Sequence, residues 1–236
     1  MTKKMSLASR ATLAAALTVC MGWASASASV VNLYSAGPGL GVGIPDNQYL
    51  GSLASMVSNT INVAGGLGLV EEVEVTVSIN HTWVGDLTIK LQGPSGIVVT
   101  LMSRPGFAEL ADDGNSCCGS SSDLIAANAI TFDDDVGTSA ETIGSLGNPI
   151  PSFTVHPDPG SAAGGSLSAF DGLAAAGNWT LYIGDSSGGD IGTLDAWSLR
   201  LTTADTNGTP VPEPATLAIL GLGLAGLGFM RRRRAA

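Results

Sequence analysis

The stretch NHTWVGDLTIKLQGPSGIVVTL, residues 80–101, predicts a β-hairpin. Within it, Leu87, Ile89 and Leu91 alternate with polar residues, which is the period-two pattern of a half-buried strand. A Gly-Pro-Ser-Gly turn at residues 93–96 then reverses the chain, because proline presets the backbone for a turn and glycine relaxes its last position. The β-branched residues that follow the turn supply the return strand.

Just ahead of this hairpin, polar and aromatic side chains crowd the point where the strand begins. His81, Trp83 and Asp86 stand close together there, a combination that core packing alone does not require.

Other stretches carry the same alternation. Residues 70–80 place valine and isoleucine on one side and acidic or hydroxyl side chains on the other, which predicts a strand between core and solvent. Residues 177–202 predict two strands that bury Trp179 and Trp197, and each indole N–H then needs a hydrogen-bond partner. Shorter strands are expected at residues 60–63, 130–132 and 153–155.

Residues 80–101 resemble the signature of the P domain, also called Homo B, a β-sandwich module that follows the subtilisin-like domain in proprotein convertases. Residues 177–202 resemble its closing hairpin, and Ile44-Pro45-Asp46 is similar to its usual opening. The resemblance covers residues 44–203 and implies an all-β fold, a jelly-roll-like sandwich of about eight strands. The resemblance also implies that His81, Trp83 and Asp86 are structural, with His81 and Asp86 forming hydrogen bonds at the strand start. In convertases this module packs on the protease domain and helps it to fold. Here we expect it to stand alone.

The start of the chain has the pattern of a secretory signal peptide over residues 1–28. A basic leading region precedes a mostly apolar run at residues 11–23, which is too short for an ordinary membrane span. Cleavage is expected after Ala28, with Ala26 as the second choice. The Gly-, Ser- and Ala-rich residues 29–43 are expected to be a lead-in to the sandwich.

The end of the chain combines a motif, an apolar helix and a basic cluster. Pro212-Glu213-Pro214 precedes the apolar residues 215–230, and four arginines follow. A helix of this length is short for a membrane core of about 30 Å, and arginines mark the cytoplasmic side. After the linker 204–210, residues 211–236 resemble the PEP-CTERM sorting signal of Gram-negative bacteria. The resemblance implies processing near Pro-Glu-Pro by an exosortase, transient membrane anchoring and a final place outside the cell. An ordinary single-pass anchor is the alternative.

The charge of the exported part is strongly negative. Between residues 29 and 210 there are three basic and nineteen acidic residues, a difference of sixteen negative charges. Such a surface repels phosphate backbones, so nucleic acid is not expected as a partner.

Carboxylates gather in one long irregular stretch, residues 103–128, and shortly after it. Asp112 and Asp113 lie within it, and Asp133, Asp134 and Asp135 follow a short strand. Adjacent carboxylates repel one another unless water or a cation neutralises them, and calcium accepts irregular oxygen ligands. These five aspartates are candidate calcium ligands, and a solvated acidic loop is the equal alternative.

Cys117 and Cys118 are the only cysteines left after signal cleavage. Because they are neighbours, they cannot join distant strands. A vicinal disulfide is plausible in an oxidising compartment, and metal binding or free thiols are the other possibilities.

Two stretches have some likeness to hydrolase motifs. The string GDSSGG at residues 184–189 and the serine at Ser139 resemble nucleophile motifs, but the chain has only His81 and His156 as bases, outside the expected settings. We therefore expect no catalytic residues.

The sequence predicts an exported, non-catalytic P-domain-like protein of the cell surface or extracellular matrix. It is expected to act through binding, with an exopolysaccharide or a surface protein as partner and with calcium as the one candidate cofactor. An accessory that helps a separately encoded subtilisin-like protease to fold is the alternative. An independent hydrolase is a third hypothesis.

Overall fold

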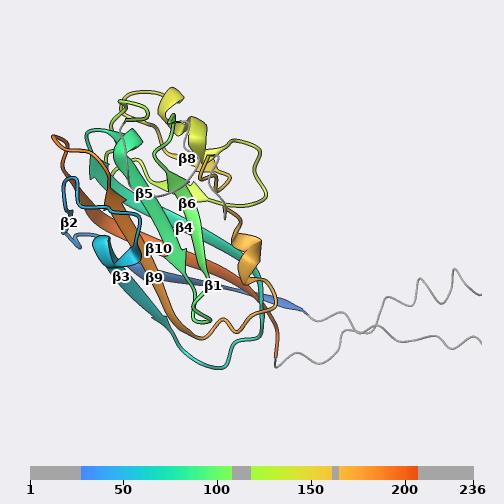
Figure 1. Cartoon of the computed structure of the whole chain (residues 1–236). Helices are drawn as coiled ribbons and strands as arrows, with labels where there is room; N and C mark the ends of the chain where they lie inside the picture. The colour runs from blue at the N-terminus through green and yellow to red at the C-terminus, as the bar shows by residue number, and fades with distance from the viewer. Residues whose placement is uncertain (1–27, 108–117, 161–164, 207–236) are drawn as a thin grey trace, which may run out of the picture. The chain divides into compact units, whose positions relative to one another are not determined.

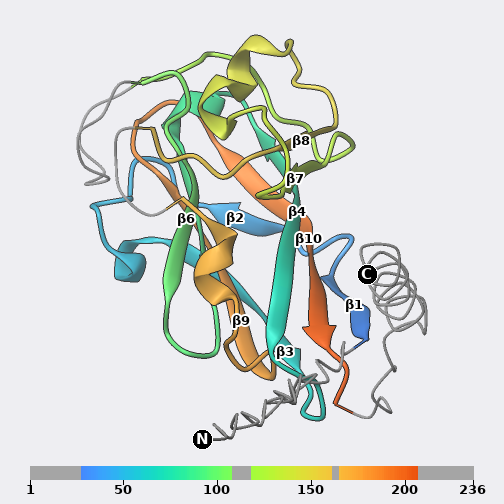
Figure 2. The same ribbon diagram turned by 90° about the vertical axis from the view of Figure 1, so that its right-hand side faces the viewer.

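The computed structural model describes residues 28–107, 118–160 and 165–206, and these form two β-sheets packed face to face. The sheets are separate in Figure 2, and the core lies between them. The six-stranded sheet has the order β1-β10-β4-β7-β8, with β2 also paired to β10, and the four-stranded sheet has the order β3-β9-β5-β6 (Figure 1). The predicted all-β sandwich is confirmed.

The strands of the six-stranded sheet are β1 (Ser29–Ala36), β2 (Val42–Ile44), β4 (Val70–His81), β7 (Ile130–Phe132), β8 (Phe153–Val155) and β10 (Gly192–Ala204). Those of the four-stranded sheet are β3 (Val57–Val63), β5 (Leu87–Gln92), β6 (Val98–Ser103) and β9 (Gly177–Asp185). Four short 3₁₀ helices lie between them, η1 (Leu53–Ser55), η2 (Val84–Asp86), η3 (Ala140–Ser145) and η4 (Leu167–Phe170).

The organising hairpin forms as its sequence predicts. Strands β5 and β6 pair antiparallel, and the Gly93 N–H donates to the Ile97 carbonyl at 3.0 Å to close the turn. Gly96 has a φ of 85°, in the left-handed region that glycine enters without a steric cost. Strand β5 also pairs with β9, so the hairpin occupies one side of the four-stranded sheet.

Strand β4 separates the core from the outer face of the six-stranded sheet. Its valine and isoleucine side chains from Val73 to Ile79 are buried, and Glu72 and Glu74 lie on the opposite, partly exposed side. Because β4 pairs with both β10 and β7, its glutamates lie beside residues from distant parts of the sequence.

Both predicted core tryptophans are buried, and each has the partner that its indole N–H requires. Trp179 Nε1–H donates to the Ala175 carbonyl at 2.8 Å, and Trp197 Nε1–H donates to Asn59 Oδ1 at 2.8 Å. Trp179 also meets the ring of Phe170 edge to face, with 4.9 Å between the ring centroids.

The described residues contain ten strands where about eight were expected, and β1 and most of β2 lie in the stretch expected to be a lead-in. Strand β1 pairs with β10 along its whole length, from Ser29 opposite Ala204 to Ala36 opposite Trp197. None of its side chains is fully buried, and from Val31 to Ala36 exposed side chains alternate with half-buried ones. Because the apolar Val31 and Leu33 lie on the exposed side, the sequence of this strand shows no alternation of apolar and polar residues. The Gly-, Ser- and Ala-rich composition of residues 29–43 predicted a connecting segment, and this prediction was wrong because the chain forms an edge strand there.

Among the described residues, no helix is long and apolar enough to cross a membrane. The apolar residues 215–230, the sorting motif at Pro212, Glu213 and Pro214, and the signal peptide up to residue 27 lie outside the described residues. Ala28, the expected cleavage position, is described, and its carbonyl accepts a hydrogen bond from the Asp205 N–H at 2.7 Å. Cleavage there stays a prediction.

Candidate functional site

A pocket of about 370 Å³ opens on the outer side of β4, next to the end of β7 and the start of η4. We call it the acidic pocket, because six carboxylates line it: Glu71, Glu72, Asp133, Asp134, Asp135 and Asp171. Strand pairing assembles it, since β7 lies beside β4 with Phe132 opposite Val75. The residues that follow β7 are thereby brought to the exposed side of β4.

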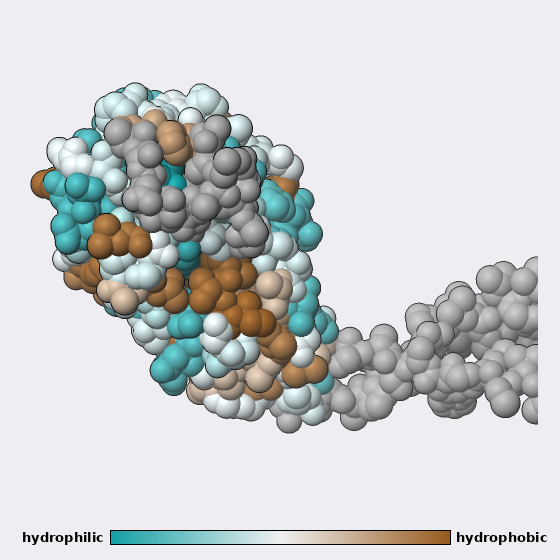
Figure 3. All heavy atoms as spheres, in the orientation of Figure 1, coloured by the Kyte–Doolittle hydropathy of each residue, from teal (hydrophilic) through white to brown (hydrophobic). Residues whose placement is uncertain are grey.

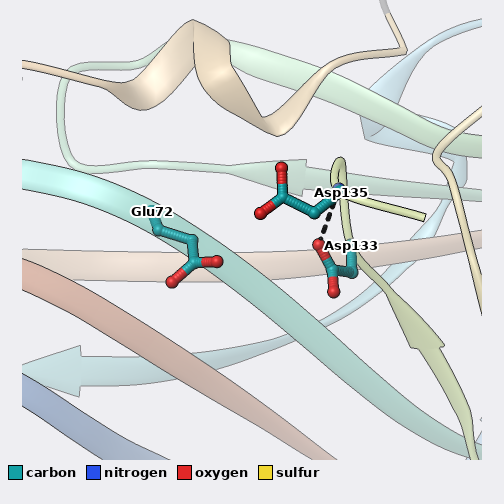
Figure 4. Close-up of side chains that lie close together, drawn as sticks. All are labelled: Glu72, Asp133 and Asp135. Carbon is teal, nitrogen blue, oxygen red and sulfur yellow. Dashed lines mark hydrogen bonds between the residues drawn. The ribbon is translucent and has the colours of Figure 1, made fainter.

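Three of these carboxylates converge. One oxygen each from Glu72, Asp133 and Asp135 lies within 4.8 Å of the other two. Figure 4 shows the three side chains close together beside β4. The Asp135 N–H donates to Asp133 Oδ1 at 2.8 Å, which holds the turn after β7 in this arrangement. Carboxylate oxygens are the ligands that hard divalent cations prefer, so these three residues form a possible metal-binding cluster.

Asp134 has a different role from its two neighbours. Its carboxylate accepts hydrogen bonds from the N–H groups of Leu167 and Ser168, at 3.0 and 2.8 Å, and from the Ser166 hydroxyl at 2.7 Å. These bonds satisfy free main-chain donors at the start of η4, as N-terminal capping residues do. Asp134 therefore fixes η4 against the pocket.

Arg200 of β10 is the cation beside this cluster. It forms an ion pair with Glu74 and lies 3.6 Å from Glu72, and Glu72 also accepts a hydrogen bond from the Thr202 hydroxyl at 2.8 Å. Burial raises the pKa of Glu74, and Arg200 acts against that rise. Burial, together with Asp134 and Glu72, raises the pKa of Asp171. Negative charge is in excess throughout the pocket.

The sequence predicted part of this site. Asp133 and Asp135 are brought together, Asp134 is used for capping, and Asp112 and Asp113 lie outside the described residues. Glu72 was not among the candidates. Its position on the solvent side of a predicted strand was visible, but the pairing of β4 with β7 was not.

A second group of ionisable residues is buried at the other end of β4. We call His81, Asp86 and Asp185 the buried polar cluster. His81 Nε2 lies 3.2 Å from Asp185 Oδ2, and neither side chain is exposed. His81 Nδ1 lies 2.9 Å from the Trp83 carbonyl oxygen. At the strand start His81 therefore pairs with Asp185, which lies at the end of β9 and belongs to the GDSSGG string of the sequence.

Asp86 is the unusual member of this cluster. Its side chain is buried, and its Oδ1 has no hydrogen-bond partner. Burial raises the pKa of Asp86 to about 6, with the carboxylates of Asp185 and Asp190 adding to the effect and His81 acting against it.

Cys118 is disulfide-bonded, and its Sγ lies 3.6 Å from the Ser187 hydroxyl in the turn between β9 and β10. Its bonding partner lies outside the described residues, as does Cys117. A vicinal pair of Cys117 and Cys118 stays a prediction.

Comparison with known families identifies two parts of the chain. The family described as "Proprotein convertase P-domain" matches residues 70–121 and 152–201, and the "PEP-CTERM protein-sorting motif" matches residues 210–234. Both resemblances indicated by the sequence are thus confirmed. No curated protein matches the chain.

Two solved structures are similar to the chain. One is the complex of a serine protease of Aeromonas sobria with a chaperone, at 21% identity and a TM-score of 0.43, covering 76% of this chain and 28% of that one. The other is the serine protease of Aeromonas sobria, at 20% identity and a TM-score of 0.42, covering 75% of this chain and 27% of that one. The chain thus spans little more than a quarter of their length.

Proposed function

We propose, from the P-domain and the sorting motif that this chain carries, that it is an exported, non-catalytic protein of the cell surface or extracellular matrix that acts by binding. The acidic pocket is the observation that carries the proposal, because it offers an open group of convergent ligands on a module described as an accessory to proteases. Calcium is the cofactor we assign to it, with Glu72, Asp133 and Asp135 as protein ligands and water in the remaining positions. Calcium accepts about six to eight oxygen ligands in irregular geometry.

Calcium also explains how so acidic a protein binds an anionic partner. A surface with sixteen excess negative charges between residues 29 and 210 repels an anionic exopolysaccharide. A calcium ion in the acidic pocket offsets part of this negative charge and leaves coordination positions for the partner's oxygens. Co-sedimentation of the full chain with an anionic exopolysaccharide should therefore require calcium and fail in a Glu72→Gln, Asp135→Asn double variant. Equal sedimentation with a chelator present would contradict this assignment.

The environment of His81 supports a non-catalytic role. Both ring nitrogens contact groups of the protein, and the side chain is inaccessible to a substrate, whereas a general base must reach the proton that it removes. Incubation of the chain with casein and with p-nitrophenyl acetate should give no hydrolysis above that of a His156→Ala variant. A rate that this variant abolishes would overturn the non-catalytic assignment.

The C-terminal motif supports export and sorting by an exosortase, with residues 215–230 as a transient membrane anchor. Replacement of Pro212, Glu213 and Pro214 by alanine should leave the protein in the membrane fraction of an exosortase-containing Gram-negative host. A Thr209→Ala control should reach the surface or the medium. Identical fractionation of the two variants would contradict processing at the motif.

The accessory role is the second candidate. Edge strand β1 exposes Val31 and Leu33 by 52% and 70%, and apolar residues also gather in a band on the face shown in Figure 3. Exposed apolar surface of this kind is typical of docking sites. If the chain assists a protease, pull-down from an envelope extract should recover a subtilisin-like protease, and Leu33→Asp should abolish its capture. Recovery of polysaccharide without a protease would favour the first candidate.

A further inference from the structure

The buried polar cluster lies where several segments of the sandwich meet. Asp185 ends β9, and its carbonyl accepts a hydrogen bond from the Tyr49 N–H at 2.8 Å. The carbonyl of Asp86, at the end of η2, accepts one from the Ser186 N–H at 3.0 Å, and the Gly85 N–H donates to the Ser120 carbonyl at 2.9 Å. These main-chain hydrogen bonds join the segments that carry Asp86 and Asp185 to each other and to two neighbouring loops.

Two buried polar atoms in this region have no partner, Asp86 Oδ1 and Ser186 Oγ. The residues are exposed by only 1% and 6%. A buried ionised carboxylate without full hydrogen bonding is costly, because burial removes the water that would solvate its charge. Protonation removes the charge and gives the carboxyl group a donor.

The charges that act on Asp86 come from three sides. Asp185 and Asp190 belong to the end of β9 and the following turn, Asp46 follows β2, and His81 ends β4. Three of the four are negative, and Asp46 and Asp190 already accept hydrogen bonds from the Gly189 N–H and the Thr82 hydroxyl. The disulfide at Cys118 adds no titrating thiol. Arg104, at the end of β6, has its guanidinium 5.3 Å from the Phe107 ring centroid and is not among these charges.

A metal ion fits this cluster poorly. Among the described residues, only Glu72, Asp133 and Asp135 bring three ligand atoms within 4.8 Å of one another. His81, Asp86 and Asp185 do not converge in that way, so a proton is the cation that suits the space.

We propose that Asp86, flanked by Asp185 and His81, is a buried proton-binding switch that tightens the loop end of the sandwich when the surroundings become acidic. This use of the fold is independent of the acidic pocket and of calcium.

The direction follows from proton linkage. The pKa of Asp86 is raised from 3.8 to about 6 on folding. Asp86 therefore stabilises the fold fully when the pH is below 3.8, its pKa in the unfolded chain. This stabilisation is lost as the pH rises through about 6, its pKa in the folded protein. Between pH 7.5 and pH 5.0 the ratio of folded to unfolded protein should rise roughly tenfold through Asp86 alone, which corresponds to about 3–5 °C in Tm.

The test is thermal unfolding of the full chain at pH 7.5 and pH 5.0 with a chelator present. Asp86→Asn mimics the protonated carboxyl group, so this variant should be more stable than the wild type at pH 7.5 and should lose that advantage at pH 5.0. Glu71→Gln, which neutralises an exposed carboxylate elsewhere, should follow the wild-type pH profile. Parallel profiles for the wild type and Asp86→Asn would overturn the proposal.

A second measurement does not depend on a variant. Carbon-13 NMR of the wild-type aspartate carboxyl groups should show the Asp86 resonance titrating near pH 6, and hydrogen exchange at the Tyr49 and Ser186 amides, corrected for intrinsic rates, should slow as the pH falls. Titration of Asp86 below pH 4.5 would refute the switch even if Asp86→Asn failed to fold.

Discussion

The acidic pocket and the buried polar cluster are both rich in carboxylates, but they lie in opposite environments. Glu72, Asp133 and Asp135 line an open pocket with a volume of about 370 Å³. In the cluster, Asp86 and Asp185 are closed off from solvent. The first group is open to a hydrated divalent cation, whereas the second is closed to one and is proposed to take up a proton. Access to solvent, more than the number of charges, is therefore the difference on which the two proposals rest.

The stability effects should differ in the same way. A carboxylate in the open pocket is solvated, so its removal should change the free energy of unfolding little. Removal of one partner from a buried pair leaves the other partner buried without its interaction, which should lower the free energy of unfolding much more. The following predictions test that difference, from the largest expected effect to the smallest.

Asp185→Ala should be the most destabilising of these changes. It removes the buried partner of His81 and should lower the free energy of unfolding by about 3–5 kcal/mol. Asp135→Ala, measured with a chelator, should change it by less than about 0.5 kcal/mol. Urea unfolding of both variants checks the contrast, and equal losses would show that the two groups are not energetically distinct.

Asp171→Asn should have a smaller effect, with a definite dependence on pH. Burial raises the pKa of Asp171, so its contribution to stability is present below its unfolded pKa and is lost as the pH rises through the folded value. In calcium-free buffer the variant should be more stable than the wild type at pH 7.5 by a few tenths of a kcal/mol and equal to it near pH 3.5. A variant that is less stable at pH 7.5 would reverse the sign assigned to burial at this position.

Glu71→Gln should be the mildest change. Glu71 is exposed, lines the pocket and is not one of the three convergent carboxylates. The free energy of unfolding of the Glu71→Gln variant should therefore stay within about 0.5 kcal/mol of the wild-type value. A calcium response reduced as strongly as in Glu72→Gln would extend the binding cluster to this residue.

Much of the fold is predictable from local pattern. Strands β4, β5 and β9 alternate apolar and polar residues because one face of each packs against the core, and this period is visible without knowledge of their neighbours. Strand β1 is an edge strand without fully buried side chains, so its sequence carries no such period.

The sites are less predictable, because strand pairing assembles them. Glu72 meets Asp133 only through the register of β4 with β7, and His81 meets Asp185 across 104 positions of sequence. Composition pointed to Asp133 and Asp135 as ligands, but it did not distinguish them from Asp134, which caps η4. Register depends on the packing of the whole sheet, and the local pattern of one strand does not reveal which residues it will meet on its neighbour.

The central claim, that the acidic pocket binds calcium, is tested most directly by thermal unfolding of the full chain with calcium and with a chelator. A ligand that binds only the folded state stabilises it by about 2.7 kcal/mol at a hundredfold excess over Kd. The wild type should therefore gain several degrees in Tm with calcium, and a variant carrying Glu72→Gln, Asp133→Asn and Asp135→Asn should gain none. Equal Tm values for the wild type in calcium and in chelator, or a calcium gain that survives in the triple variant, would contradict the claim and return these carboxylates to the solvated surface.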